Sequence, residues 1–191
     1  MNNHRLIGAL AAVALLAPLG ACSKADEKSA PTAQASNGTL AAELGGAPGL
    51  TTFSTALADA GLGDVFDGPG SYTVLAPDDD AFAKLDQGGK TLTDPAHRAE
   101  LVAVMRGHIL PGHLTPEAIR KAVADKKGPV SMRSLDESMV TFTTDGDTIV
   151  VTGADGGKAR VDGAALVASN GVVLPLDGLV KSPPPVSAEP S

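Results

Sequence analysis

The chain has 191 residues, a formal net charge of -7, one cysteine, one tyrosine and no tryptophan. A single cysteine excludes an intramolecular disulfide, a multi-thiolate zinc site and an iron–sulfur cluster. The acidic balance disfavours nucleic acids and other anionic partners, and aromatic residues at 3% offer few platforms for stacking bases or sugars. Hydrophobic residues, at 43%, are numerous enough for a packed core.

The first segment, residues 1–21, has the pattern of a targeting signal. Leu6 to Leu19 contains no charged residue and is shorter than the roughly 20 residues of a membrane-spanning helix. Leu19-Gly20-Ala21-Cys22 resembles a lipobox, the processing motif of bacterial lipoproteins. The resemblance implies cleavage between Ala21 and Cys22 and acylation of Cys22, whose two or three acyl chains would hold the protein on a membrane. The alternative is an ordinary signal peptide with a chance cysteine.

The residues after Cys22 suggest a location and a tether. With Ser23 next to the cysteine, bacterial sorting rules favour the outer membrane, at its periplasmic or surface face, over the inner membrane. Residues 22–38 are expected to form a flexible tether, because Ser23 to Gly38 contains no Val, Ile, Leu, Met or Phe. Residues 182–191 are Pro-rich, and we expect a disordered tail in preference to a partner-binding motif.

Residues 39–181 remain as one domain with 19 acidic and 12 basic residues. Apolar residues at helical spacing predict a helix around Leu50 to Leu57 that stops at Gly61. A short strand is expected at 72–75. Acids or proline at the first positions mark three more helix starts, of which we expect the last to be short: Pro77 to Asp80, Thr93 to Pro95, and Thr115 to Glu117.

From Val130 onward the apolar period changes to two residues, which is typical of strands. The pattern predicts strands at 130–135, 139–144, 148–152, 159–161 and 172–176. Turn sequences separate them: Asp145-Gly146-Asp147, Asp155-Gly156-Gly157 and Asn170-Gly171. Helices followed by hairpins indicate an α+β fold in which helices pack on a curled antiparallel sheet.

Three ordered segments carry a resemblance to a known family: Tyr72 to Leu85, Leu101 to Leu114, and Ala168 to Val180. Upstream of them, Leu50 to Gly70 resembles the helix pair that precedes the first segment in that family. The first runs from a strand through Ala-Pro into an acid-capped helix, and the last closes on Leu176-Asp177-Gly178-Leu179-Val180. In this order they resemble the signatures of the fasciclin-domain family. The resemblance implies a wedge-like β-sandwich decorated with helices, and non-catalytic roles in adhesion and surface interaction.

Two positions depart from the family pattern. The middle segment usually carries a Tyr-His pair, which in animal members is linked to integrin adhesion. Here Gly107 stands in place of the tyrosine, while His108 is kept. Leu174 replaces a histidine common in the closing signature. Integrin binding is therefore not carried over, and His108 is expected to be an interaction residue or a structural histidine that hydrogen-bonds at a helix end.

The residues give no independent sign of catalysis, and we expect no enzyme activity and no cofactor. The chain lacks a Gly-x-Ser-x-Gly elbow and the Lys-Ser/Thr pair of a phosphate-binding loop. Asp78, Asp79 and Asp80 could bind calcium, but helix capping explains them better. We expect no metal site, with His97 and His113 at the surface.

Together these features predict a lipid-anchored protein of the bacterial cell envelope that acts in surface adhesion or protein–protein interaction. Its expected partners are the membrane, through the acyl chains on Cys22, and an envelope, matrix or surface protein whose identity the sequence does not specify. The alternative is a carrier of a small apolar ligand such as a lipid or pigment, which some family members bind. An unrecognised hydrolase ranks third.

Overall fold

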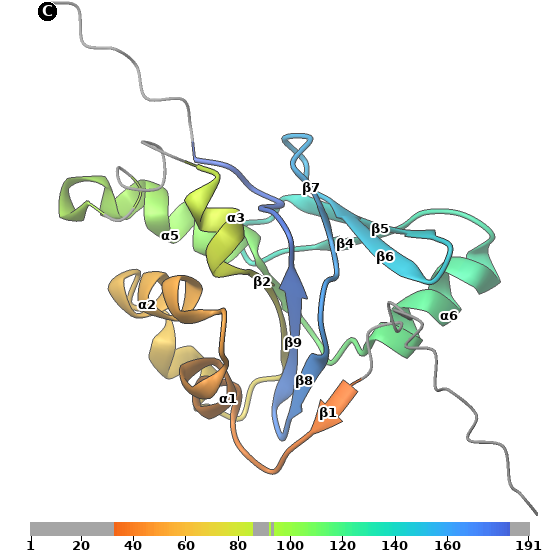
Figure 1. Ribbon diagram of the computed structural model, residues 1–191, viewed down its shortest axis with the longest axis horizontal. Helices are drawn as coiled ribbons and strands as arrows, with labels where there is room; N and C mark the ends of the chain where they lie inside the picture. Colours follow the sequence, from red (N-terminus) through yellow and green to blue (C-terminus); the bar gives the residue numbers. More distant parts are fainter. Residues whose placement is uncertain (1–32, 86–91, 93, 184–191) are drawn as a thin grey trace, which may run out of the picture.

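The computed structural model describes residues 33–85, 92 and 94–183; the expected signal segment, Cys22, residue 93 and residues 184–191 lie outside this part of the chain. A layer of helices covers one side of a sheet, and a second sheet with a further helix lies on its other side (Figure 1). Within the described residues, none of the helices has the length and apolar character needed to span a bilayer.

The helical layer consists of α1 (Leu40–Gly46), α2 (Thr51–Asp59), α3 (Asp79–Ala83) and α5 (Arg98–Gly107), with short 3-10 turns at Gly63–Phe66 and Pro95–His97. Side-chain caps begin two of these helices, because the first N–H groups of a helix have no partner within it. Thr39 accepts from the N–H of Ala42, and Asp78 accepts from the N–H of Ala81. The expected helices at 50–57 and after Pro77 are confirmed, whereas α1 was not predicted.

The first sheet has five strands in the order β1-β8-β9-β2-β3. Their bounds are β1 (Ala33–Ala35), β2 (Tyr72–Pro77), β3 (Ile109–Pro111), β8 (Ala165–Ala168) and β9 (Gly171–Leu176). The α+β fold is confirmed, with one difference in strand direction. The pairs β2–β9 and β1–β8 are parallel, so only part of this sheet is antiparallel. Strand direction depends on connections between distant segments, which local periodicity does not report.

The second sheet is antiparallel throughout, in the order β4-β5-β6-β7. Its strands are β4 (Val130–Arg133), β5 (Met139–Asp145), β6 (Thr148–Thr152) and β7 (Lys158–Arg160), close to the expected positions. Helix α6 (Pro116–Lys126) packs against this sheet. The expectation of a short helix there was wrong: Thr115 caps a helix of 11 residues that ends at Lys127, which has a left-handed φ of 53°.

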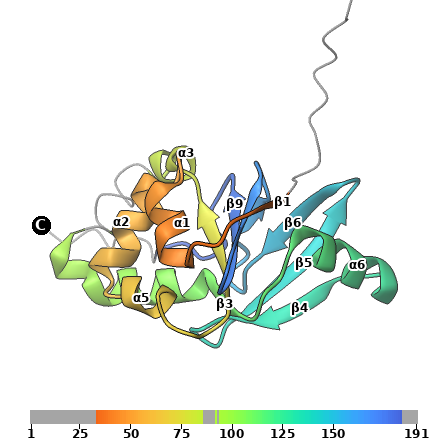
Figure 2. The ribbon, with the colours of Figure 1, turned by 90° about the horizontal axis from the view of Figure 1, so that it is seen from below.

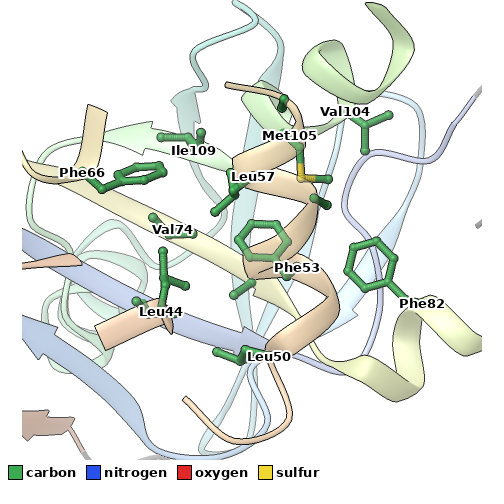
Figure 3. Packing of buried hydrophobic residues seen from close by; sticks show 14 of the residues in the cluster. Leu44, Leu50, Phe53, Leu57, Phe66, Val74, Phe82, Val104, Met105 and Ile109 are labelled. Atoms are coloured by element: carbon green, nitrogen blue, oxygen red, sulfur yellow. The ribbon is translucent and has the colours of Figure 1, made fainter. Parts of the chain in front are cut away.

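Two hydrophobic clusters fill the layers on either side of the first sheet. The strand β2 contributes to both, because alternate side chains of a strand point to opposite faces. Val74 and Ala76 join the cluster under the helices, while Leu75 joins the cluster between the two sheets and α6. Figure 3 shows the first cluster, where Phe53 from α2 lies between the central strands and Met105 of α5. The central strands are therefore buried on both faces, which explains their continuous apolar sequence.

The N-terminal boundary differs from the expected one. Strand β1 lies within the expected tether and pairs with β8, with Ala33 opposite Ala165 and Ala35 opposite Val167. The next residues are also bound, because the N–H of Ser36 donates to the carbonyl of Val167 at 2.8 Å. Strand pairing at a sheet edge uses backbone groups, so it does not require the large apolar side chains whose absence suggested a tether.

Candidate functional site

The position of the Tyr-His motif is the first candidate site, and α5 places it. This helix buries Leu101, Val104 and Met105 against the helical layer and ends at His108. His108 is completely buried, and its ring lies edge-on to Phe53 with a centroid distance of 6.2 Å. A partner at the surface therefore has no access to this imidazole.

Both ring nitrogens of His108 are hydrogen-bonded inside the protein. Nδ1 lies 2.9 Å from the carbonyl oxygen of Val104, which can only accept, so Nδ1 carries the proton. Nε2 accepts from the backbone N–H of Val180 at 3.1 Å. Burial lowers the pKa of His108 to about 4, against the opposing effect of its hydrogen bond to Val104 and of nearby Asp155 and Asp136. The imidazole is therefore neutral near pH 7 and joins the end of α5 to the chain after β9.

Gly107 creates a close contact that a larger residue would disturb. A Cβ atom added there would lie 2.5 Å from Cδ of Lys181, whose side chain crosses over the glycine. The ammonium of Lys181 forms an ion pair with the carboxylate of Asp136 in the loop between β4 and β5. The place where the family pattern has tyrosine is thus covered by a lysine that joins the C-terminal segment to the second sheet.

Asp136 is the most strongly perturbed carboxylate described. Burial alone would raise the pKa of Asp136, but Lys181 and the hydroxyls of Ser134 and Ser138 hold it well below its usual range. The Ser138 hydroxyl donates to Oδ1 at 2.7 Å, and its backbone N–H donates at 3.2 Å. The carboxylate stays charged and fully bonded, which suits a fixed anchor better than an acid–base catalyst.

A small pocket of about 120 Å³ lies beside this ion pair. It is lined by Gly107, Ser138, Val140, Gly153, Ala154, Asp155, Val180 and Lys181. A second, more open groove of about 480 Å³ lies between the α1–α2 loop and the ends of β8 and β9. Its walls include Pro48, Leu50, Leu166 and Pro175, with the acids Asp78 and Asp162. The groove offers apolar side chains and two carboxylates, a surface suited to contact with another molecule.

The remaining candidates have structural positions. Asp78 caps α3, and Asp79 accepts from the N–H of Thr52 at 2.8 Å, a bond that lowers the pKa of Asp79. His97 lies 3.6 Å from Glu100 at the surface, and His113 is exposed. In the described part of the chain, no three His, Cys, Asp or Glu side chains gather as a metal-binding group. Ala21 and Cys22, the expected processing site, lie outside the described residues.

Two important residues were not singled out from the sequence. Asp136 and Lys181 are 45 positions apart, and nothing local links them. A weak signal was present for Asp136, because Ser134 and Ser138 flank it at the spacing of a side-chain-stabilised turn.

Comparison with known proteins agrees with this architecture. Residues 48–181 match the family model of the fasciclin domain, and the chain belongs to that family. It is 31% identical over 161 residues to the Synechocystis protein sll1483, and the match covers 82% of each chain. The insect cell adhesion molecule Fasciclin I, solved as a FAS1 domain pair, has a similar fold: TM-score 0.67, 13% identity, over 76% of this chain and 51% of that one.

The chain also matches two animal proteins, but only over a small part of the length of each. The chain is 28% identical to the pig transforming growth factor-beta-induced protein ig-h3, covering 68% of this chain and 17% of that protein. It is 30% identical to human stabilin-1, covering 76% of this chain and 5% of that protein. The family is associated with adhesion and protein interaction, and its domains are generally non-catalytic.

Proposed function

We propose that this protein is a bacterial lipoprotein, anchored through acylated Cys22 on the cell envelope and preferentially on the outer membrane. Its fasciclin domain acts there without catalysis, in surface adhesion or in binding another envelope, matrix or surface protein. The lipobox-like sequence Leu19-Gly20-Ala21-Cys22 supports the anchor, and membership of the fasciclin family supports the adhesive role.

The observation that carries the proposal is that the ionisable side chains at and beside the Tyr-His motif position are fully bonded within the protein. His108 is enclosed, neutral and bonded at both nitrogens, and the charged carboxylate of Asp136 is paired with Lys181. Groups held in this way are poor acids, bases or nucleophiles, because each would first have to break its internal bonds. A partner would therefore contact the exterior of the domain. The open groove beside Leu166 and Pro175 is a suitable part of that surface.

The direct test compares the host cell with a strain that lacks the gene. We expect the deletion strain to adhere less to surfaces or to form less biofilm, and the wild-type gene to restore this behaviour. A Cys22→Ser variant expressed at the same level should not restore it, because the domain would lose its anchor. Unchanged adhesion across several surfaces and partners would contradict the proposal, as would mass spectrometry showing an unmodified mature N-terminus.

The partner can be sought by affinity capture from an envelope extract, using the mature chain with and without residues 182–191. A protein captured by both forms would bind the domain, and one captured only by the longer form would bind the tail. Native mass spectrometry of protein purified from its host provides a contrary outcome. A bound apolar molecule of defined mass would favour the carrier function over adhesion.

A further inference from the structure

Strand β1 is held to the domain by more than its three strand pairs. Beyond the register with β8, the N–H of Ser169 and its hydroxyl both donate to the carbonyl of Gly38, at 2.8 and 3.0 Å. The hydroxyl of Ser36 donates to the Glu43 carboxylate at 2.5 Å and accepts from the N–H of Gly38 at 3.0 Å. The chain from Ala33 to Thr39 is therefore part of the domain, attached along the β8 edge.

This attachment limits how far the domain can move from an anchor at Cys22. Ten residues separate Cys22 from Ala33, and they span at most about 36 Å when fully extended. If β1 were released, the 17 residues before Leu40 would span up to about 60 Å. A domain of this size has a radius of gyration of about 15 Å. The shorter span is therefore comparable with the width of the domain.

The attachment also determines which part of the domain lies nearest the anchor. Figures 1 and 2 both place the start of β1 on the same half of the molecule as α6. Helices α2, α3 and α5 lie on the other half in both views. A chain held at the start of β1 would therefore keep the α6 half closer to a membrane than the helical layer.

Charge is distributed unequally between these two halves. Residues 39–107, which include the helical layer, contain ten acids and four bases, whereas residues 109–162, which include α6 and the second sheet, contain eight acids and seven bases. Within that half, α6 and its C-cap, residues 116–127, contain four bases and two acids. Lys121 pairs with Asp125 at 2.6 Å, while Lys126 and Lys127 are exposed at the C-terminal end of the helix. The nearby turn adds Asp147, whose carbonyl accepts from Arg120. Together with its C-cap Lys127, α6 carries a net charge of +2, against +1 for α5, in an acidic domain.

We propose that β1 orients the anchored domain: it holds the tether on the β8 edge so that the basic end of α6 faces the anionic lipid headgroups of the bilayer. The acidic helical layer then faces away from the membrane, toward a partner. Lysines close to an anionic membrane surface are attracted to it, and the acidic layer is repelled. This inference rests on the lipid anchoring proposed above, so its two parts are tested separately.

The first experiment tests the attachment of β1 without any lipid. In a parallel pair, the backbone N–H and C=O groups of alternate residues point toward the partner strand. Because the N–H of Ser36 donates to Val167 of β8, the backbone groups of Gln34 also point toward β8, and those of Ala35 point away. In a mature chain with Cys22→Ser, Gln34→Pro should increase hydrogen exchange at Val167 and Ser169. The matched Ala35→Pro variant removes an N–H that makes no strand bond, so exchange should stay at the wild-type level. Equal exchange in both variants would overturn the attachment.

The second experiment measures orientation with the lipidated chain in vesicles of phosphatidylethanolamine and phosphatidylglycerol that contain a headgroup nitroxide lipid. A fluorophore is attached at Ala124→Cys in α6 or at Ala58→Cys in α2, two exposed alanines on opposite halves. Acylated Cys22 has no free thiol to react. We expect stronger quenching at position 124 than at 58, and loss of this difference in Gln34→Pro but not in Ala35→Pro.

The contribution of charge to this orientation is tested with the same quenching measurement. Replacing Lys126 and Lys127 with glutamine, or using phosphatidylcholine vesicles at high salt, should reduce the difference in quenching, because both weaken attraction to the headgroups. Lys84→Gln in the helical half should leave it unchanged. Equal quenching at positions 124 and 58 of a vesicle-bound chain would refute the orientation alone. If the mature chain purified from its host carried no acyl groups, the anchoring would be refuted, and the orientation with it.

Discussion

The imidazole of His108 and the backbone N–H of Val180 join two parts of the chain that are 72 positions apart. One part is the end of α5, and the other is the segment that follows β9. Because Nδ1 of the same ring donates to Val104, the ring can accept from Val180 only in its neutral form. His108 therefore links the helical layer to the closing segment of the fasciclin domain.

The first prediction concerns this link. His108→Ala leaves the buried N–H of Val180 without a partner and opens a cavity beside Phe53, so the free energy of unfolding should fall by about 3 kcal/mol. Urea denaturation followed by circular dichroism measures the change. His113→Ala, at an exposed position, should change stability by less than about 0.5 kcal/mol. A small effect of the His108 substitution would show that the ring is not needed for this contact.

Stability should also depend on pH through His108. The unfolded chain binds a proton near pH 6.5, but burial lowers the pKa of the folded histidine to about 4. Between these values the unfolded state holds more protons, so stability is complete above pH 6.5 and falls as the pH drops, by up to about 3 kcal/mol near pH 4. Denaturation curves from pH 7 to 4.5 test this before Asp79 and Asp136, whose pKa values are also lowered, begin to protonate.

The control for this pH dependence is His108→Gln, which cannot take up a proton at position 108. Its stability should change less than that of the wild type across the same range, although it starts lower at pH 7. Parallel curves for the two proteins would assign the pH dependence to other groups and contradict the prediction.

The ion pair of Asp136 and Lys181 should contribute more than a surface pair. Asp136 has a side chain only 9% exposed and accepts three further hydrogen bonds from two serines. A double-mutant cycle with Asp136→Asn and Lys181→Met should give a coupling energy of about 1–2 kcal/mol. The matched pair Lys121–Asp125, 74% and 64% exposed, should give at most about 0.5 kcal/mol. Equal coupling in the two cycles would contradict the importance assigned to Asp136.

Much of the fold was accessible from sequence because its signals are local. The period of Leu50 to Leu57, the acid at the start of α3 and the Asp-Gly turns of the second sheet each act over a few residues. The strands β1, β3 and β8 have only three or four residues each and were not predicted. β1 and β3 lie at the two edges of the first sheet, and β8 lies between β1 and β9. Pairings such as β1–β8 join segments far apart in the chain, which local patterns do not reveal.

The candidate site was predicted only in part, for the same reason. A histidine at the end of an apolar helix face was visible, and so was the glycine before it. The lysine that covers Gly107 and the carboxylate that holds it come from two other segments. Contacts over such separations form only when the sheets and helices have packed, and no spacing rule in the sequence records them.

Gly171 should tolerate no larger residue. A Cβ atom at this position would lie 2.1 Å from the carbonyl oxygen of Tyr72 in the paired strand and 2.5 Å from Leu40. Gly171→Ala should therefore separate β9 from β2 and cost about 3 kcal/mol or more in unfolding free energy. Gly45→Ala in α1 meets no atom within 4 Å and should stabilise the protein by about 0.5–1 kcal/mol. Similar melting temperatures for the two variants would contradict this packing.

Asn170, beside Gly171, has a role beyond the turn that its sequence predicted. Its side-chain amide donates to the carbonyls of Phe66 and Gly68, at 2.6 and 3.1 Å, and its Oδ1 accepts from the N–H of Leu40 at 2.8 Å. One side chain thus satisfies three backbone groups on the helical side. Asn170→Asp should cost about 2–3 kcal/mol, because a carboxylate would face two carbonyl oxygens and could donate to neither.

The measurement for Asn170→Asp is urea denaturation at pH 7, supported by hydrogen exchange at Leu40. Exchange there should stay slow in Asn170→Asp, whose oxygen can still accept from the Leu40 N–H, and become fast in Asn170→Ala, which removes the acceptor. Because α1 begins at Leu40, the alanine variant should also loosen this helix. If both variants were as stable as the wild type, the Asn170 side chain would have no part in holding α1 to the β8–β9 turn.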